Sequence, residues 1–356
     1  MTAATAQGTP ATGSELVLIS VYIPLAVTAV LTVLAPRLSR RLAPRSAAWA
    51  LACAALVTTV GWTGSLALLA FTAVAQIPQV AAEGHWSIPA LRAEDPVHLA
   101  VAVAGALVLA VGGVSLILAA ARQAHHLLWA RRECARMPGD SELTVVDDDT
   151  PQAFALPGAP GRIVVSRGML RCLADEEREA LLAHERAHLR SRHHLFQTLW
   201  RLTAAANPLL RPLADAGGFA LERWADEEAA AQVGSRRIVA RAVGRAALAS
   251  SSHASRTPTL AVTGGPVPQR VQALLAPPPP RRTLPIAGGA LLLALCCAGL
   301  ANAASDSDQM LDDAQRVLCA ASITHTSGAP RPEGFHHGQD VCCERRIRGE
   351  RAERHE

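Results

Sequence analysis

The chain has no lysine and few aromatic residues. All 34 of its basic residues are arginine, and Phe, Trp and Tyr make up 3% of its 356 residues, so its apolar half consists mainly of Ala, Leu and Val. The basic residues are nearly balanced by 30 acidic ones, which gives a formal net charge of +4. Because this balance is mild and no basic stripe with interleaved aromatic residues is present, the composition argues against a nucleic-acid partner.

Charge is also absent from four long apolar runs, which contain no potentially charged side chain apart from His98. A helix needs roughly 20 apolar residues to cross the hydrocarbon core of a bilayer, so four crossings fit. The alternative is four buried helices of a large soluble protein, but such helices seldom lack every charge over this length. We therefore expect a membrane domain over residues 1–122 with three transmembrane helices, at about 16–35, 47–77 and 97–121, and a fourth transmembrane helix at 284–303.

Arginine is distributed unequally among the segments that flank these runs. Residues 1–15 contain none and 78–96 contain one, whereas 36–46 and the two ends of 122–283 contain several. The positive-inside rule therefore predicts a multi-pass plasma-membrane protein with an external N-terminus, a cytoplasmic segment 122–283 and an external, disordered tail at 304–356. Because no basic residue precedes the first run, a cleaved signal peptide is the weaker interpretation.

The cytoplasmic segment is the part of the chain that can form a water-soluble core. Short apolar stretches bounded by turn residues predict strands, and an acidic first turn at residues 175–177 predicts the start of a helix. The expected elements are strands at 142–147 and 162–166 and helices at 175 to about 193, 218–233 and 236–250. This mixture indicates an α+β domain over 123–250, followed by a Pro-rich linker over 251–283, in a mainly α protein.

Residues 184–188 read His-Glu-Arg-Ala-His. Positions four apart lie on one face of a helix, so His184 and His188 can direct two imidazoles at one metal ion. Glu185 can reach a metal-bound water and act as its general base, since zinc lowers the pKa of that water towards roughly 7. The simpler alternative is a solvated, charged helix whose histidines have no role.

A catalytic zinc needs a third protein ligand, and a pair of carboxylates follows downstream. Glu222 and Asp226 are again four residues apart, hence on one helical face. Glu222 can complete the ligand set, and Asp226 can accept a hydrogen bond from the free ring nitrogen of a ligating histidine. Taken alone, both would be ordinary surface carboxylates. Their position one helix and a turn after the histidines favours the functional interpretation.

Several stretches of the chain resemble the integral-membrane gluzincin peptidases, which include the HtpX-type and CAAX-prenyl-protease-type enzymes. The resemblance covers roughly residues 143–230 and rests on these motifs in this order: Asp-Asp-Asp-Thr-Pro-Gln-Ala-Phe-Ala-Leu at 147–156, Ile-Val-Val-Ser-Arg-Gly-Met-Leu at 163–170, His-Glu-Arg-Ala-His at 184–188, Asn-Pro at 207–208 and Glu-Arg-Trp-Ala-Asp at 222–226. The flanking apolar runs are similar to those of the antirepressor peptidases of beta-lactam-sensing systems.

This resemblance implies a zincin-like metallopeptidase domain with one Zn²⁺ per chain. The ligands would be His184, His188 and Glu222, with Glu185 as base and Asp226 behind the ligands. It also implies that an extended substrate pairs with the strand at 162–166. The residues expected to line the cleft there are Ile163, Val164 and Val165. One departure from the relatives is His193, near a position where they often have Asp.

We expect the chain to be a membrane-bound zinc metalloendopeptidase that cleaves proteins or peptides at the lipid bilayer. The antirepressor relatives indicate regulatory proteolysis, with a transcriptional repressor as a possible substrate, and the HtpX-type relatives indicate membrane-protein quality control. A non-enzymatic membrane signal transducer that retains the zincin fold remains an alternative, and Glu185 argues against it because a retired site has no need for a base. A soluble secreted protease with apolar packing helices is the other alternative.

Overall fold

The computed structural model describes residues 13–85, 87–89, 99–137, 139, 141–254 and 266–277, with a few single positions beyond residue 290. The chain divides into two compact units. One comprises Met1–Val21, Leu66–Leu107 and Ala301–Glu356, and the other comprises Tyr22–Ser65 and Val108–Leu300. The second unit contains the sheet and every residue of the candidate site.

Four helices precede the sheet in the described chain: α1 (Gly13–Arg41), α2 (Pro44–Ala75), α3 (Pro78–Gly84) and α5 (Leu99–Arg136). Among the described residues, α2 and α5 are the helices long and apolar enough to cross a membrane. They correspond to the second and third predicted spans, and the first predicted span lies within α1. The fourth predicted span and the predicted tail fall almost entirely outside the described residues.

Helix α5 continues well past residue 121, where the third span was expected to end. Residues 122–136 contain no Gly or Pro and are rich in Ala, Leu and Arg, which are good helix formers. The helix ends at Arg136, close to the sequence Pro138-Gly139. One continuous helix therefore leads from the apolar span into the domain that follows.

That domain begins with a sheet of three strands, β1 (Leu143–Val146), β2 (Ala153–Leu156) and β3 (Arg162–Ser166), in the order β1-β3-β2. The central strand β3 is buried along its whole length, runs parallel to β1 and is antiparallel to β2. Strands β1 and β3 were expected from the sequence. Strand β2 was missed, because its four residues follow a turn-rich stretch and are too few to display a period.

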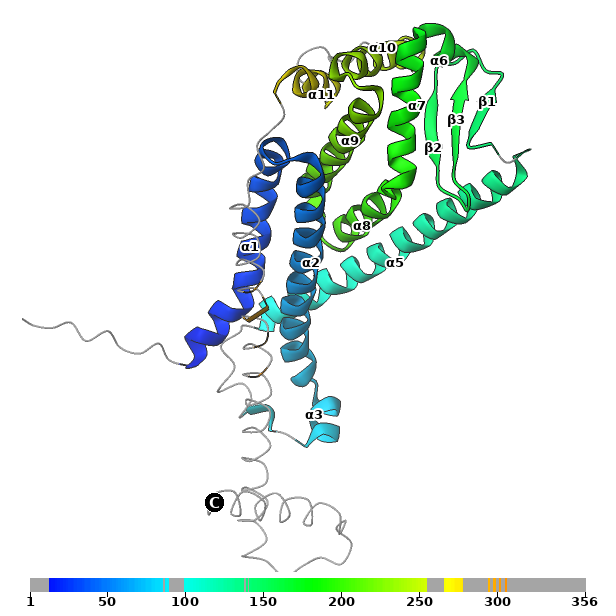
Figure 1. The fold of residues 1–356 in the computed structure, drawn as a ribbon. Coiled ribbons are helices and arrows are strands. Elements are labelled where there is room, and N and C mark those ends of the chain that lie inside the picture. Colours follow the sequence, from blue (N-terminus) through cyan, green and yellow to red (C-terminus); the bar gives the residue numbers. More distant parts are fainter. Residues whose placement is uncertain are drawn as a thin grey trace, which may run out of the picture. The chain divides into compact units, whose positions relative to one another are not determined.

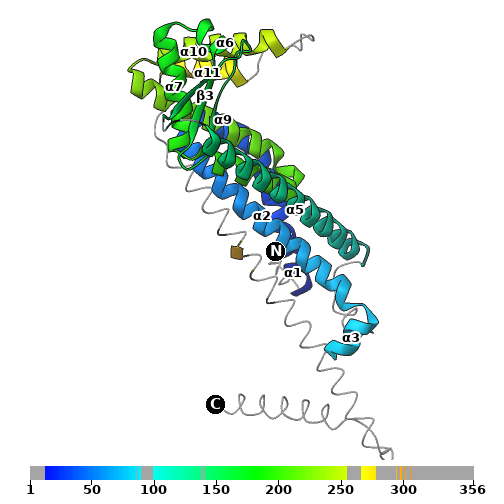
Figure 2. The ribbon, with the colours of Figure 1, turned by 90° about the vertical axis from the view of Figure 1, so that its right-hand side faces the viewer.

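The rest of the domain is helical: α6 (Arg167–Cys172), α7 (Asp175–Arg190), α8 (His193–Ala206), the 3₁₀ turn η1 (Pro208–Leu210), α9 (Arg211–Val233), α10 (Arg236–Ala254) and α11 (Pro266–Leu275). Helices α7, α9, α10 and α11 pack against one another, beside the sheet (Figures 1 and 2). A mainly helical protein with a small sheet is thereby confirmed. The segment predicted as a linker differs from expectation, because it contains α11, which packs on α10 and α9.

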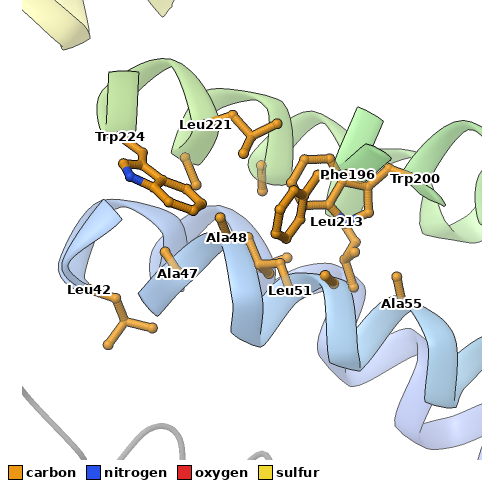
Figure 3. Packing of buried hydrophobic residues seen from close by; sticks show 14 of the residues in the cluster. Leu42, Ala47, Ala48, Leu51, Ala55, Phe196, Trp200, Leu213, Leu221 and Trp224 are labelled. Atoms are coloured by element: carbon orange, nitrogen blue, oxygen red, sulfur yellow. The ribbon is translucent and has the colours of Figure 1, made fainter. Parts of the chain in front are cut away.

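A cluster of buried side chains joins helices α8 and α9 to the adjoining ends of α1 and α2 (Figure 3). Small residues of α2, such as Ala48 and Ala55, face the rings of Phe196 and Trp200 on α8 and of Trp224 on α9. Alanines allow close approach, while the aromatic rings bury large apolar areas. Helix α9, which bears Glu222 and Asp226, therefore packs against the α1–α2 pair.

Candidate metal centre

Helices α7 and α9 lie side by side and supply the central residues of the site (Figure 1). Helix α7 begins at an acidic first turn, where the Glu177 carboxylate accepts a hydrogen bond from the backbone N–H of Ala174 at 3.0 Å. It presents His184 and His188 one turn apart, and α9 presents Glu222 opposite them. Two helical faces therefore bring two imidazoles and a carboxylate together.

The Nε2 atoms of the two histidines point at each other and at Glu222. They are 3.1 Å apart, and Glu222 Oε2 and Oε1 lie 3.6 Å and 3.5 Å from His184 Nε2 and His188 Nε2. All three prospective ligand atoms fall within 4.8 Å of one another. In the part of the chain that the structure describes, this is the one group of His, Cys, Asp and Glu with such spacing.

The opposite ring nitrogens face other side chains. His184 Nδ1 lies 3.0 Å from Asp226 Oδ1, although its N–H is not in line with that oxygen. His188 Nδ1 lies 2.9 Å from Nδ1 of the buried His193. Both Nδ1 atoms therefore face side chains behind the rings, and the two Nε2 atoms are directed towards Glu222 and the position of a cation. The sequence had marked His193 only as a departure from the relatives and had assigned it no contact.

Glu185 lies beside this cluster with 9% of its surface exposed. The backbone N–H of Ala155, on strand β2, favours the charged form of its carboxylate. Burial raises the pKa of Glu185 above its ordinary value, and the neighbouring His184 only partly offsets this effect. A carboxylate with a raised pKa is suited to accepting and returning a proton.

The pKa values of the three prospective ligand residues lie far from their ordinary values. Burial alone would lower the pKa of His184, but the carboxylates of Asp226 and Glu222 outweigh it and raise this pKa to about 10. Burial and the nearby His184 lower the pKa of His188 to about 4. Burial would raise the pKa of Glu222, but the contact with His184 and the charge of Arg270 lower it to about 2. Without a metal, His184 is therefore the protonated member of the cluster at neutral pH.

Arg270, on α11, is the site residue that the sequence analysis missed. Its guanidinium contacts both carboxylates of α9, at 2.9 Å from Glu222 Oε2 and at 2.7 and 2.8 Å from the two oxygens of Asp226. No spacing rule connects residue 270 to the motif at 184–188, and the surrounding prolines favoured a linker. The regular apolar positions of α11 were the only local signal.

A cavity of about 420 Å³ opens beside the cluster. His184, Glu185, Glu222 and Arg270 form its polar side. Its other side is mostly apolar and is contributed by β2, α6, α7, α10 and α11; the apolar lining residues are Pro151, Ala153, Met169, Ala180, Leu181, Val239, Ala242, Val243, Ala246, Ala247 and Val267. The cavity can therefore accept an apolar side chain next to the polar cluster.

The residues predicted to pair with an extended substrate lie on the central strand of the sheet and not on an edge strand. Ile163, Val164 and Val165 belong to β3, whose two edges are paired with β1 and β2. An added strand cannot pair with β3, because the backbone groups that it needs are already used. The edge strand on the side of Glu185 is β2.

Parts of the chain are similar to known proteins. Residues 120–214 match Peptidase family M48. Parts of the chain are similar to proteins named protease HtpX homolog: 37% identity over 103 residues in Aquifex aeolicus (28% of this chain, 33% of that protein), 35% over 94 residues in Desulforapulum autotrophicum (26% and 30%) and 45% over 65 residues in Thermoplasma acidophilum (18% and 20%). No solved structure matches the chain.

The chain spans a third or less of the length of these curated relatives. The family match includes both histidines of the cluster and ends before Glu222, Asp226 and Arg270. The predicted resemblance to membrane gluzincin-type metallopeptidases of the HtpX kind is confirmed by the match of residues 120–214 to Peptidase family M48 and by the similarity to proteins named protease HtpX homolog.

Proposed function

We propose that this chain is a membrane-bound zinc metalloendopeptidase. The observation that carries the proposal is the convergence of His184, His188 and Glu222, whose prospective ligand atoms lie within 4.8 Å of one another. The match of residues 120–214 to a peptidase family and the presence of two span-like helices support it.

The residues present fit a zinc ion. Two histidines and one carboxylate are a common donor set for catalytic zinc, which keeps a further position open for water or substrate. Here the Nδ1 atoms are engaged by Asp226 and His193, so the Nε2 atoms of His184 and His188 would be the ligands together with Glu222. We expect one zinc ion per chain. When bound, zinc lowers the pKa of a water molecule and polarises the scissile carbonyl.

Glu185 is the proposed general base and acid. Its carboxylate takes a proton from the attacking water as the water oxygen bonds to the carbonyl carbon. It then delivers this proton to the leaving nitrogen as the C–N bond breaks. Its burial and raised pKa suit the first step, because a less acidic carboxyl group accepts the proton more readily.

Strand β2 is the proposed docking edge for an extended substrate. The backbone N–H of Ser166 donates to Gln152 O at 2.9 Å, and alternation along an antiparallel pair then turns the backbone groups of Phe154 and Leu156 towards β3. Those of Ala153 and Ala155 point the other way, towards the side of Glu185. A peptide paired with β2 would therefore pass the base and the cavity.

The wider role is proposed from the resemblance alone. A cytoplasmic catalytic domain on a multi-pass plasma-membrane protein would act on protein or peptide substrates in regulatory proteolysis or membrane-protein quality control, and a transcriptional repressor is one candidate substrate. A non-enzymatic transducer is disfavoured by Glu185, because burying an unneeded carboxylate is costly.

The test is a Glu185→Gln variant of the full chain in detergent, assayed on an unstructured protein such as casein. We expect the variant to bind zinc like the parent and to lose cleavage by at least about 100-fold, the usual contribution of a general base. Zinc content by metal analysis and the cleavage rate are measured on the same samples.

Glu179→Gln is the matched control, because Glu179 lies on the exposed face of the same helix. It should retain full cleavage. Equal rates for the Glu185→Gln variant and the parent would refute the proposed mechanism.

A further inference from the structure

Helix α11 places one guanidinium against two carboxylates of the metal centre. The Arg270 side chain is 12% exposed, and its Nε and Nη2 atoms pair with Asp226 Oδ2 and Oδ1 at 2.8 and 2.7 Å. Its remaining terminal nitrogen, Nη1, lies 2.9 Å from Glu222 Oε2. All three nitrogens of the fork are therefore used, which a lysine ammonium could not reproduce with the same geometry.

These contacts divide the oxygens of Glu222 between two directions. Oε2 lies between Arg270 Nη1, at 2.9 Å, and His184 Nε2, at 3.6 Å, whereas Oε1 is directed to His188, at 3.5 Å from its Nε2 atom. In the same way, Asp226 is held by Arg270 while Oδ1 remains 3.0 Å from His184 Nδ1. Arg270 thus contacts one residue that faces the prospective cation and one residue that orients a ligand.

We propose that Arg270 is a positioning residue of the metal centre, which fixes the orientation of Glu222 and Asp226 and so prepares the site for a divalent cation. The inference rests on the proposed function for the nature of that cation. It assigns a role to a helix that lies beyond the segment matched to Peptidase family M48. Arg270 would not touch the reacting atoms for this purpose and would act through its two partners.

Coulomb attraction alone predicts that removing Arg270 strengthens zinc binding. Without Arg270, the carboxylates of Glu185, Glu222 and Asp226 would leave the site more negative, and a cation would be attracted more strongly. Positioning predicts the reverse, because two carboxylates of α9 would lose the group that orients them and would repel each other. The sign of the change in zinc affinity therefore separates the two effects.

The experiment measures the zinc dissociation constant of the full chain in detergent, by competition with a chromophoric chelator. We expect Arg270→Lys and Arg270→Gln to bind zinc about 10- to 100-fold more weakly than the parent, the usual cost of losing a residue that orients metal ligands. Arg270→Lys distinguishes the two effects better, since lysine keeps the positive charge but lacks the planar guanidinium that contacts both carboxylates.

Arg236 provides the matched control for a purely structural effect. Its guanidinium donates to the carbonyl oxygens of Ala273 and Ala276 at the end of α11 and pairs with Glu227 at 2.6 Å, without reaching the metal centre. Arg236→Lys and Arg236→Gln therefore weaken contacts of α10 with α11 and α9 without removing a partner of Glu222 or Asp226. We expect these variants to stay within about threefold of the parent in zinc affinity, since they leave the ligands and their partners unchanged.

The inference is overturned if the Arg270 variants bind zinc as tightly as the parent, or more tightly, or if the Arg236 variants lose as much affinity as they do. Because the readout needs no substrate, it is independent of cleavage. A parent protein that binds zinc but cleaves nothing refutes the proposed function alone. A parent that binds no zinc refutes the proposed function and this inference together.

Discussion

His188 and His193 share a contact between their Nδ1 atoms, 2.9 Å apart, in a buried environment. For His188 to offer Nε2 to a cation, its Nδ1 must carry the hydrogen and His193 Nδ1 must accept it. The ring of His193 is itself packed against Trp224, with the two centroids 4.8 Å apart. The imidazole of His193 thus stands where the resemblance leads us to expect a carboxylate. Its packing against Trp224 fixes its orientation.

Replacing His193 by Phe should test this arrangement, because Phe keeps a ring against Trp224 and removes the acceptor. We expect zinc affinity to fall by about tenfold, as His188 loses the partner that holds its ring. Chelator competition measures the change. His194→Phe, at the adjacent position of α8, should leave the affinity unaltered, and equal affinities for the two variants would contradict the role given to His193.

The pKa values of the ligands predict a proton count for zinc binding. At pH 6 the metal-free His184 is protonated, since its pKa is raised to about 10, whereas His188 (about 4) and Glu222 (about 2) have already lost their protons. A ligand imidazole must be neutral at its binding nitrogen, so zinc should displace about one proton per ion at pH 6. Affinity should accordingly rise by about tenfold per pH unit below the pKa of His184.

Calorimetry in two buffers of different ionisation enthalpy measures this proton release directly. In an Asp226→Asn variant the main carboxylate that raises the pKa of His184 is gone, so fewer protons should be released. A parent protein that releases no proton at pH 6 would show that His184 is neutral before zinc binds.

At the scale of elements, the contact between α9 and the end of the α1–α2 pair includes a buried cation. Arg223 is buried and donates hydrogen bonds to the carbonyl oxygens of Ser39 and Arg40, at 2.8 and 3.3 Å, in the last turn of α1. A cation at a helix C-terminus satisfies carbonyl groups that have no partner within the helix. Arg45 adds a cation–π contact by lying 5.4 Å from the ring centroid of Trp224.

Replacing Arg223 by Met should weaken this contact while preserving its apolar stem. We expect the free energy of unfolding to fall by about 2 kcal/mol, because hydrogen bonds from a charged donor are lost and two carbonyl groups remain buried. Reversible urea denaturation in detergent, followed by tryptophan fluorescence, measures the loss. Arg237→Met, at an exposed position of α10, should change the stability little, and similar losses in both variants would contradict the proposed contact.

At the scale of the whole molecule, the features that the sequence could predict are those set by local periodicity. Positions four apart define one helical face, so the pairing of His184 with His188, and of Glu222 with Asp226, is visible without a structure. The apolar runs that became α2 and α5 are likewise visible as uninterrupted stretches. The acidic turn at residues 175–177 marked the start of α7 correctly.

The features that the sequence could not predict depend on tertiary packing. Strand β2 has four residues and is recognisable as a strand only through its pairing with β3. Arg270 reaches the centre because α11 packs on α9, and the prolines around α11 resemble those of a linker. The substrate edge was assigned to β3 because the order of strands in a sheet cannot be read from their order in the chain.

Glu222 and Arg223 are neighbours on α9, yet they serve opposite sides of it. Glu222 faces the histidines of α7, and Arg223 donates a hydrogen bond to a carbonyl group in the last turn of α1. Because the two residues share one stretch of helical backbone, a displacement of α9 at its contact with α1 would also displace the carboxylate of Glu222.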